Sequence, residues 1–115
     1  MSVTPLSLAG ELARLRQRAP LTDRDIAHAT CAAPSTVRSW LTGARVPSGE
    51  RADRLLELAA VVERLARVVR DDAIVPWLRK PLDALDNDKP LDLIAAGEYR
   101  RVSRLVSELE TFSVS

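Results

Sequence analysis

The sequence has few aromatic residues, a single cysteine and a single histidine, and each scarcity excludes something. Aromatic side chains make up 3% of the 115 residues, so a hydrophobic core must be built from aliphatic side chains. One cysteine, Cys31, excludes an intramolecular disulfide and a zinc site with several cysteines. One histidine, His28, leaves little for metal catalysis. We expect His28 at the surface or half-buried, and no metal site.

Long apolar runs are also missing. No segment approaches the ~20 apolar residues that a transmembrane helix requires, so we expect no membrane partner. The first residues, Met1 to Pro5, lack the basic and then apolar order of a signal peptide. These two absences predict a soluble, cytoplasmic protein.

The abundant residue types favour helices. The sequence contains 17 leucines and 16 alanines, but only 14 valines and isoleucines together and 4 glycines. This balance is typical of helical proteins. A length of 115 residues allows one domain or two very small ones. We find no Ser/His/Asp arrangement, glycine-rich phosphate loop or pair of catalytic carboxylates. We therefore expect an all-α protein that is not an enzyme and carries no cofactor.

The net charge of +1 is unevenly distributed along the chain. Residues 1–47 carry six arginines against three acidic residues, which gives +3. Residues 48–70 carry +1, and residues 71–115 carry −3. A basic front and an acidic back suggest two surfaces with different partners. A random scatter of solvated charges would give the same values, and charge alone does not decide between the two interpretations.

Proline, glycine and capping residues divide the chain into helices. Pro20 ends a first amphipathic stretch, and Thr22 with Asp25 forms a variant of the capping box that begins the second. Pro34 suits the first turn of a third helix, and Gly43 suits its left-handed end. The expected helices cover approximately residues 6–19, 22–30, 34–41, 49–70 and 98–110.

The fourth expected helix is long, with Ser48 as a suitable N-cap, and it is apolar on more than one face. Such a helix usually has more than one packing partner. Three prolines (Pro76, Pro81 and Pro90) are then expected to divide the chain into short turns. The apolar stripe of the long helix comprises Ala52, Leu55, Leu56, Ala59, Val62, Leu65, Ala66 and Val69, broadened by Leu58, Val61 and Val68.

Residues 23–42 have the spacing of a helix-turn-helix, in which two helices are joined by a short turn. Ala27 is the small residue that lets the second helix cross the first. Cys31 follows at the turn, where glycine is common, and we expect it to be a small packed filler. Val37 and Trp40 lie one helical turn apart and are the expected anchors of the second helix.

In such motifs the second helix lies in the major groove of DNA, and its first residues reach base edges. Arg38 is suited to a bidentate pair with guanine, and Arg45, with Arg14 or Arg18 nearby, to phosphate contacts. Alternatively, the hairpin keeps its fold without binding DNA, since only one arginine lies on this helix and the pI is about 8.0. The candidate DNA contacts are Ser35, Thr36, Arg38, Ser39, Thr42 and Arg45.

The second half of the chain contains an ordered set of aromatic, proline, glycine and apolar positions. This set comprises Trp77-Leu78, Leu85, Pro90, Asp92-Leu93-Ile94, Gly97, Arg101-Val102 and Leu105. With it, residues 20–112 resemble the Xre/MbcA/ParS-type antitoxins of bacteria, which join a helix-turn-helix to a small toxin-binding domain. We therefore expect a helix-turn-helix module at 1–47, a joining helix at 48–70 and a small helical toxin-binding module at 71–115.

The resemblance implies an antitoxin of a type II toxin–antitoxin system. Its partner would be a RES-type toxin that consumes NAD, and the C-terminal region would cover the entrance of the toxin's active site. NAD would be the toxin's substrate, with no site in this chain. The resemblance also implies binding to promoter (operator) DNA as a homodimer. The alternative is a stand-alone dimeric transcriptional regulator whose C-terminal module only dimerises. A purely structural adaptor is a third possibility.

The last expected helix and the tail supply the candidate toxin contacts. The helix carries an apolar stripe that we expect to need a partner surface, and Phe112 is expected beyond the regular helix. The alternative is that Phe112 folds back onto Trp77 and caps the small core. The stripe comprises Tyr99, Val102, Leu105, Val106 and Leu109. The candidate toxin contacts are Tyr99, Arg100, Arg101, Arg104, Thr111, Phe112, Ser113, Val114 and Ser115.

Overall fold

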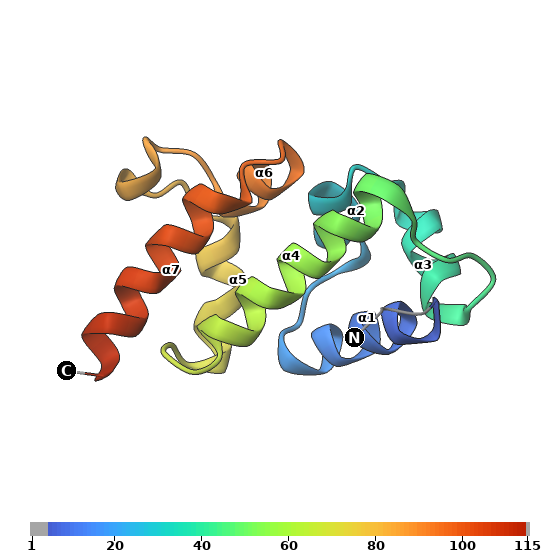
Figure 1. Cartoon of the computed structure of the whole chain (residues 1–115), viewed down its shortest axis with the longest axis horizontal. Helices are drawn as coiled ribbons and strands as arrows, with labels where there is room; N and C mark the ends of the chain where they lie inside the picture. The colour runs from blue at the N-terminus through green and yellow to red at the C-terminus, as the bar shows by residue number, and fades with distance from the viewer. Residues whose placement is uncertain (1–4, 115) are drawn as a thin grey trace.

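The computed structural model describes the backbone of residues 5–114 and the side chains of residues 8–112 (Figure 1). Within this range the chain is helical and contains no named strand, which confirms the all-α prediction. No helix within residues 5–114 is long and apolar enough to cross a membrane. The elements are α1 (Pro5–Arg18), α2 (Asp23–Thr30), α3 (Pro34–Thr42), α4 (Gly49–Leu65), α5 (Asp71–Arg79), η1 (Asp83–Leu85), α6 (Pro90–Ala95) and α7 (Tyr99–Val114).

Helix α4 runs through the middle of the molecule, with α1 to α3 at one end and α5 to α7 at the other (Figure 1). It packs against α1 and α2 on one side and against α6 and α7 on the other. Leu55, Leu58 and Leu65 of α4 are fully buried in a hydrophobic cluster to which both ends contribute. The expectation that this helix has more than one packing partner is therefore confirmed.

The local signals for α2 are confirmed. Thr22 accepts a hydrogen bond from the backbone N–H of Asp25 at 3.1 Å, and its own N–H donates to the Asp25 carboxylate at 2.9 Å. Cys31 ends the helix in the left-handed region, with φ 59°. The Ala32 N–H donates to the Ala27 carbonyl at 2.9 Å, the bond of a Schellman motif. Cys31 itself is exposed, so the interpretation of its side chain as a packed filler is wrong.

Helix α3 begins at Pro34 and ends at Gly43, which has φ 81°, as predicted. Helix α4 is shorter than predicted. It ends at Leu65 instead of near residue 70, because turns closed by hydrogen bonds from Arg67 to Arg64 and from Val68 to Leu65 reverse the chain before α5. Ser48 precedes α4 in an extended conformation, but its side chain makes no capping hydrogen bond.

Two further predictions in the second half are wrong. Pro76 lies inside α5 instead of in a turn. The hydrogen bond that its missing N–H cannot make would go to the carbonyl of Asp72, an exposed residue that water can reach. Helix α7 continues to Val114, so Phe112 lies within the helix and not beyond it. The sequence contains no proline or glycine after Gly97 that would end α7 earlier.

Candidate functional site

Helix α3 buries one face and exposes the other. Val37 and Trp40 are buried, which confirms them as the anchors of the second helix of the motif. Helical spacing brings four of the six candidate DNA contacts, namely Ser35, Arg38, Ser39 and Thr42, to the opposite face. Three of these are exposed and Ser39 is half-buried. Thr36 lies half-buried at the edge of this face, and Arg45 is exposed in the connector to α4.

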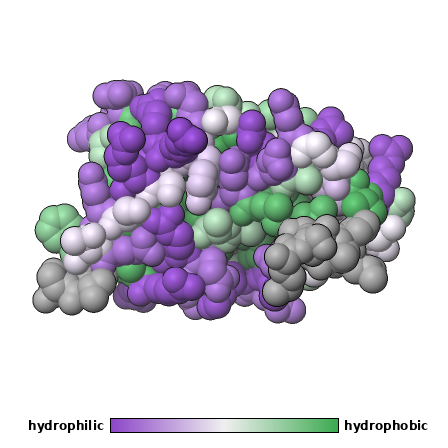
Figure 2. All heavy atoms as spheres, in the orientation of Figure 1, coloured by the Kyte–Doolittle hydropathy of each residue, from purple (hydrophilic) through white to green (hydrophobic). Residues whose placement is uncertain are grey.

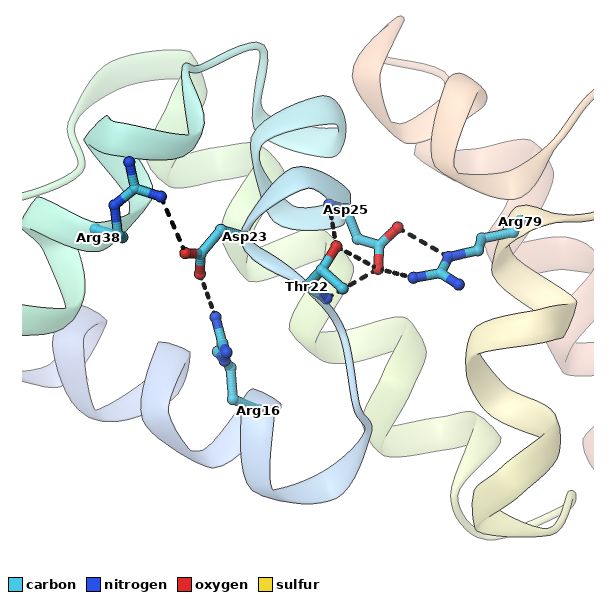
Figure 3. A network of polar contacts seen from close by, with 6 residues as sticks. All are labelled: Arg16, Thr22, Asp23, Asp25, Arg38 and Arg79. Carbon is cyan, nitrogen blue, oxygen red and sulfur yellow. Dashed lines mark hydrogen bonds and ion pairs between the residues drawn. The ribbon is translucent and has the colours of Figure 1, made fainter.

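Asp23, in the first turn of α2, connects three helices (Figure 3). One carboxylate oxygen accepts from Arg16 of α1. The other lies 3.5 Å from Nη1 of Arg38 on α3. The Asp23 side chain is 24% exposed, whereas that of Arg38 is 62% exposed. The candidate guanine-reading arginine is therefore ion-paired within its own chain, an arrangement that was not predicted from the sequence.

Asp25 forms the second carboxylate centre and joins the two ends of the molecule (Figure 3). Asp25 is buried, with 8% of its surface exposed. Arg79 of α5 donates to it with both Nε and Nη2, at 2.9 and 2.5 Å. Burial alone would raise the pKa of Asp25, but hydrogen bonds from Arg79 and Thr22 outweigh it and hold the pKa below its ordinary value. The first helix of the helix-turn-helix is thus tied to the C-terminal half.

Helix α2 also packs directly on α6. His28 of α2 contacts the carboxylate of Asp92 on α6. The thiol of Cys31 lies 3.4 Å from the carbonyl of Ala95. His28 is exposed, in agreement with the expectation of a surface side chain. The helix-turn-helix therefore rests on the C-terminal half through α2, and α3 remains on the outside.

Arg64 of α4 fastens α7 to the rest of the fold. Its guanidinium donates to the hydroxyls of Ser103 and Ser107 at 2.7 and 2.8 Å and to Glu110 at 2.7 Å. The hydrogen bond from Arg64 holds the pKa of Glu110 below its ordinary value. This clamp was not predicted from the sequence, although its three acceptors, spaced i, i+4 and i+7, form a polar stripe on one face of α7.

The apolar stripe of α7 packs within the chain. Val102 and Val106 are fully buried, and the other three members of the stripe pack partly buried against the same core. The expectation that this stripe needs a partner surface is therefore wrong, because α4, α6 and η1 cover it. Tyr99, one of the candidate toxin contacts, is accordingly half-buried.

The remaining candidate toxin contacts differ in their surroundings. Arg101 donates to the carbonyl of Leu85 at 3.0 Å and lies 3.4 to 3.5 Å from three carboxylates of its own chain. Phe112 is 81% exposed, so it contributes little to the core. Arg100, Arg104 and Thr111 are exposed. The side chains of Ser113 and Val114, and the whole of Ser115, lie outside the described residues.

A groove of about 650 Å³ lies on the surface where α1 packs against α4. Its apolar floor comes from α4, and its rim carries charges of both signs, including an ion pair of 3.1 Å between Arg18 and Glu63. Figure 2 shows an apolar area between hydrophilic side chains on this part of the surface. The lining residues are Glu11, Arg14, Gln17, Arg18, Leu56, Ala59, Ala60 and Glu63.

Comparisons with known proteins assign the chain to a family. Residues 7–70 match a helix-turn-helix domain family, and residues 64–110 match the antitoxin Xre/MbcA/ParS C-terminal toxin-binding domain. The protein class is therefore a helix-turn-helix joined to a domain of the toxin-binding type. The mycobacterial cidal antitoxin MbcA of Mycobacterium tuberculosis is 34% identical over 102 residues, which cover 89% of this chain and 90% of MbcA. The chain belongs to the Xre/MbcA/ParS antitoxin family.

One further protein and one solved structure support this assignment. The probable mycobacterial cidal antitoxin Rv3188 of M. tuberculosis is 33% identical over 82 residues, or 71% of this chain and 70% of that protein. The crystal structure of the M. tuberculosis MbcT-MbcA toxin-antitoxin complex contains a chain with a TM-score of 0.79 and 34% identity. That match covers 89% of this chain and 92% of the matched chain.

Proposed function

We propose that this chain is the antitoxin of a type II toxin–antitoxin system and inhibits a cognate toxin through its C-terminal module, residues 71–115. The observation that carries the proposal is the match of residues 64–110 to a toxin-binding domain within a chain that is similar to MbcA over 89% of its length. The similar MbcA is an antitoxin crystallised with its toxin MbcT. The family resemblance further favours a RES-type toxin that consumes NAD.

The geometry of α7 supports the proposal that the C-terminal end of this helix inhibits the toxin. Arg64 holds α7 rigidly on α4, so binding a toxin need not first order this helix. Thr111 and Phe112 are exposed near its C-terminal end, and Arg104 is exposed in its first half. An aromatic anchor that enters a desolvated pocket commonly costs ~2 kcal/mol or more when it is truncated. We propose that Phe112 is such an anchor at the entrance of the toxin's active site.

The test is co-expression with a toxin candidate, taken from the genes adjacent to the gene for this chain. Three forms are compared: the intact chain, a chain that ends at Glu110, and Arg38→Ala as a control altered only in the DNA-recognition helix. The intact chain and Arg38→Ala should restore growth, and the truncated chain should restore it poorly while keeping its melting temperature. Full protection by the truncated chain would overturn the role of the tail. No protection by the intact chain would overturn the antitoxin proposal.

We further propose that the helix-turn-helix binds the operator DNA of its own promoter. Ser35, Arg38, Ser39 and Thr42 share the outer face of α3, and residues 1–47, which contain α1 to α3, carry a net charge of +3. Such a face suits the major groove, in which the first part of the recognition helix contacts base edges. Binding that weakens steeply with added salt is the expected behaviour.

The same proposal includes a homodimer, because operators are usually read by two-fold symmetric proteins. The groove between α1 and α4 has the features of a contact surface between two copies of the chain. Its floor of Leu56, Ala59 and Ala60 is apolar, and a rim with both signs of charge lets a second copy place arginine against glutamate twice. We propose that this groove, and not the covered stripe of α7, forms the contact between two copies.

A further inference from the structure

We propose that Asp23 is a positioning residue that sets the base specificity of the recognition helix by holding Arg38 for a guanine. This inference rests on the proposed binding of DNA by α3. Asp23 contacts Arg38 across the α2–α3 angle, although the two residues are 15 positions apart in the sequence (Figure 3). In this proposal Asp23 and Arg38 set the base specificity together, and Arg38 does not set it alone.

Asp23 is itself held in place, as an anchor for Arg38 must be. Its second oxygen accepts from Arg16 of α1, and the residue lies in the first turn of α2, where the helix dipole favours an anion. The start of α2 is fixed in turn by the capping box of Thr22 and Asp25. The Asp23 side chain is mostly shielded from solvent, whereas the Arg38 side chain is mostly exposed.

The donor geometry of Arg38 leaves room for a base. A guanidinium carries five N–H donors in a planar fork, and Nη1 of Arg38 lies 3.5 Å from the carboxylate of Asp23. The remaining donors are available for the O6 and N7 acceptors of guanine, which require two parallel hydrogen bonds. A long, exposed arginine must lose rotamer freedom when it reads a base. Because Asp23 already restricts Arg38, part of that loss occurs before DNA is bound.

Asp23 also opposes non-specific binding. If Arg38 turned away to a phosphate, its ion pair with Asp23 would break, and the carboxylate would lose one of its two cationic partners near the negative DNA backbone. Binding in which Arg38 contacts a phosphate is therefore less favourable than binding in which Arg38 stays beside Asp23 and contacts a base. Removing the carboxylate should tighten binding to random DNA and weaken discrimination.

A merely structural role for Asp23, as a brace between α1, α2 and α3, would not alter base preference. The experiment is selection from a randomised duplex pool, followed by sequencing, with the intact chain and with Asp23→Asn. Asp23→Ser serves as a second variant, because it removes the carboxylate and leaves a shorter neutral side chain, while Thr22 still caps the helix. Asp72→Asn is the matched control: Asp72 lies in the first turn of α5 and pairs with Arg70, far along the chain from α3.

The intact chain and Asp72→Asn should enrich guanine at one position of each half-site. A good bidentate pair discriminates by about tenfold or more, and Asp23→Asn or Asp23→Ser should lose most of that preference while still binding the pool. Arg38→Lys should lose the same guanine preference, because lysine cannot form the planar fork. Circular dichroism of each variant confirms that α2 and α3 remain folded.

The possible outcomes separate the two proposals. If the intact chain and both Asp23 variants enrich the same guanine equally, the positioning role of Asp23 is overturned and DNA binding stands. If the Asp23 variants bind the pool but select a different or weaker motif, the inference is supported. If the intact chain enriches no sequence, the proposed DNA binding fails, and the inference fails with it.

Discussion

Replacing Asp25 with alanine removes two different kinds of contact at once. The variant loses the acceptor for the Thr22 backbone N–H, one half of the capping box of α2. It also loses the paired hydrogen bonds from Arg79, which join α2 to α5. Both contacts act on the first helix of the helix-turn-helix, so the loss should appear as lower stability of the whole fold.

The size of the effect follows from the surroundings of each group. A lost hydrogen bond to a charged group, such as the one from the Thr22 N–H to the Asp25 carboxylate, costs about 1.5–3 kcal/mol. The ion pair lies between the surface case of ~0–1 kcal/mol and the buried case of ~3–5 kcal/mol, because Asp25 is buried but Arg79 is half-exposed. We therefore expect Asp25→Ala to lower the free energy of unfolding by about 2–4 kcal/mol. At roughly 4 °C per kcal/mol, the melting temperature should fall by about 8–16 °C.

Urea denaturation of a double-variant cycle isolates the ion pair. Asp25→Ala, Arg79→Ala and the double variant should give a coupling energy of about 1–2 kcal/mol. The exposed pair of Arg70 and Asp72 is the control, and its coupling should be close to zero. A coupling between Asp25 and Arg79 no larger than that of the control would refute the reasoning that this pair ties the two ends together.

The pH dependence of the same difference gives a second check. Because the folded-state pKa of Asp25 lies below its ordinary value of 3.8, ionisation of this group stabilises the fold above that value. The stabilisation is lost as the pH falls through the folded-state pKa. The difference in unfolding free energy between the wild type and Asp25→Asn should thus be constant near neutrality and shrink in acid. A difference that stays unchanged down to the acid transition would contradict the lowered pKa.

Three other substitutions test the remaining contacts. Arg64→Ala removes the clamp between α4 and α7, and should cost about 2–3 kcal/mol and speed amide exchange in residues 103–110; unchanged exchange there would exclude the clamp. Arg38→Ala should weaken operator binding by about 1–3 kcal/mol, measured by fluorescence anisotropy, and equal affinity would remove it from the interface. Leu56→Glu should convert a dimer to a monomer in light scattering, whereas Glu50→Gln, outside the groove, should not. A Leu56→Glu dimer would reject the groove as the contact.

The sequence predicted those features that depend on neighbouring residues. Thr22 with Asp25, Pro34 and Gly43 each act within one helical turn, so their effects are local and the starts of α2 and α3 and the end of α3 follow from them. The early end of α4 is made by turns within residues 64–68, where no proline or glycine marks it, and Pro76 is accommodated in α5 because the carbonyl that it leaves without a partner belongs to an exposed residue.

The predicted recognition face follows from helical spacing, because Val37 and Trp40 define the buried side of α3. The ion pair between Arg38 and Asp23 does not follow from this spacing. Asp23 and Arg38 meet only because α2 and α3 cross, and Asp25 meets Arg79 across 54 positions of the sequence. No periodic pattern indicates such pairs. The covering of the α7 stripe was missed for the same reason, since α4 and α6 supply its partners.

The most direct test of the antitoxin proposal is the NAD content of cells that express the adjacent toxin candidate. Toxin alone should deplete NAD, and co-expression of the intact chain should keep NAD at the level of cells without toxin. A chain that ends at Glu110 should give partial depletion at equal expression. NAD depletion that is unaffected by the intact chain would contradict the central claim that this protein inhibits a toxin of that type.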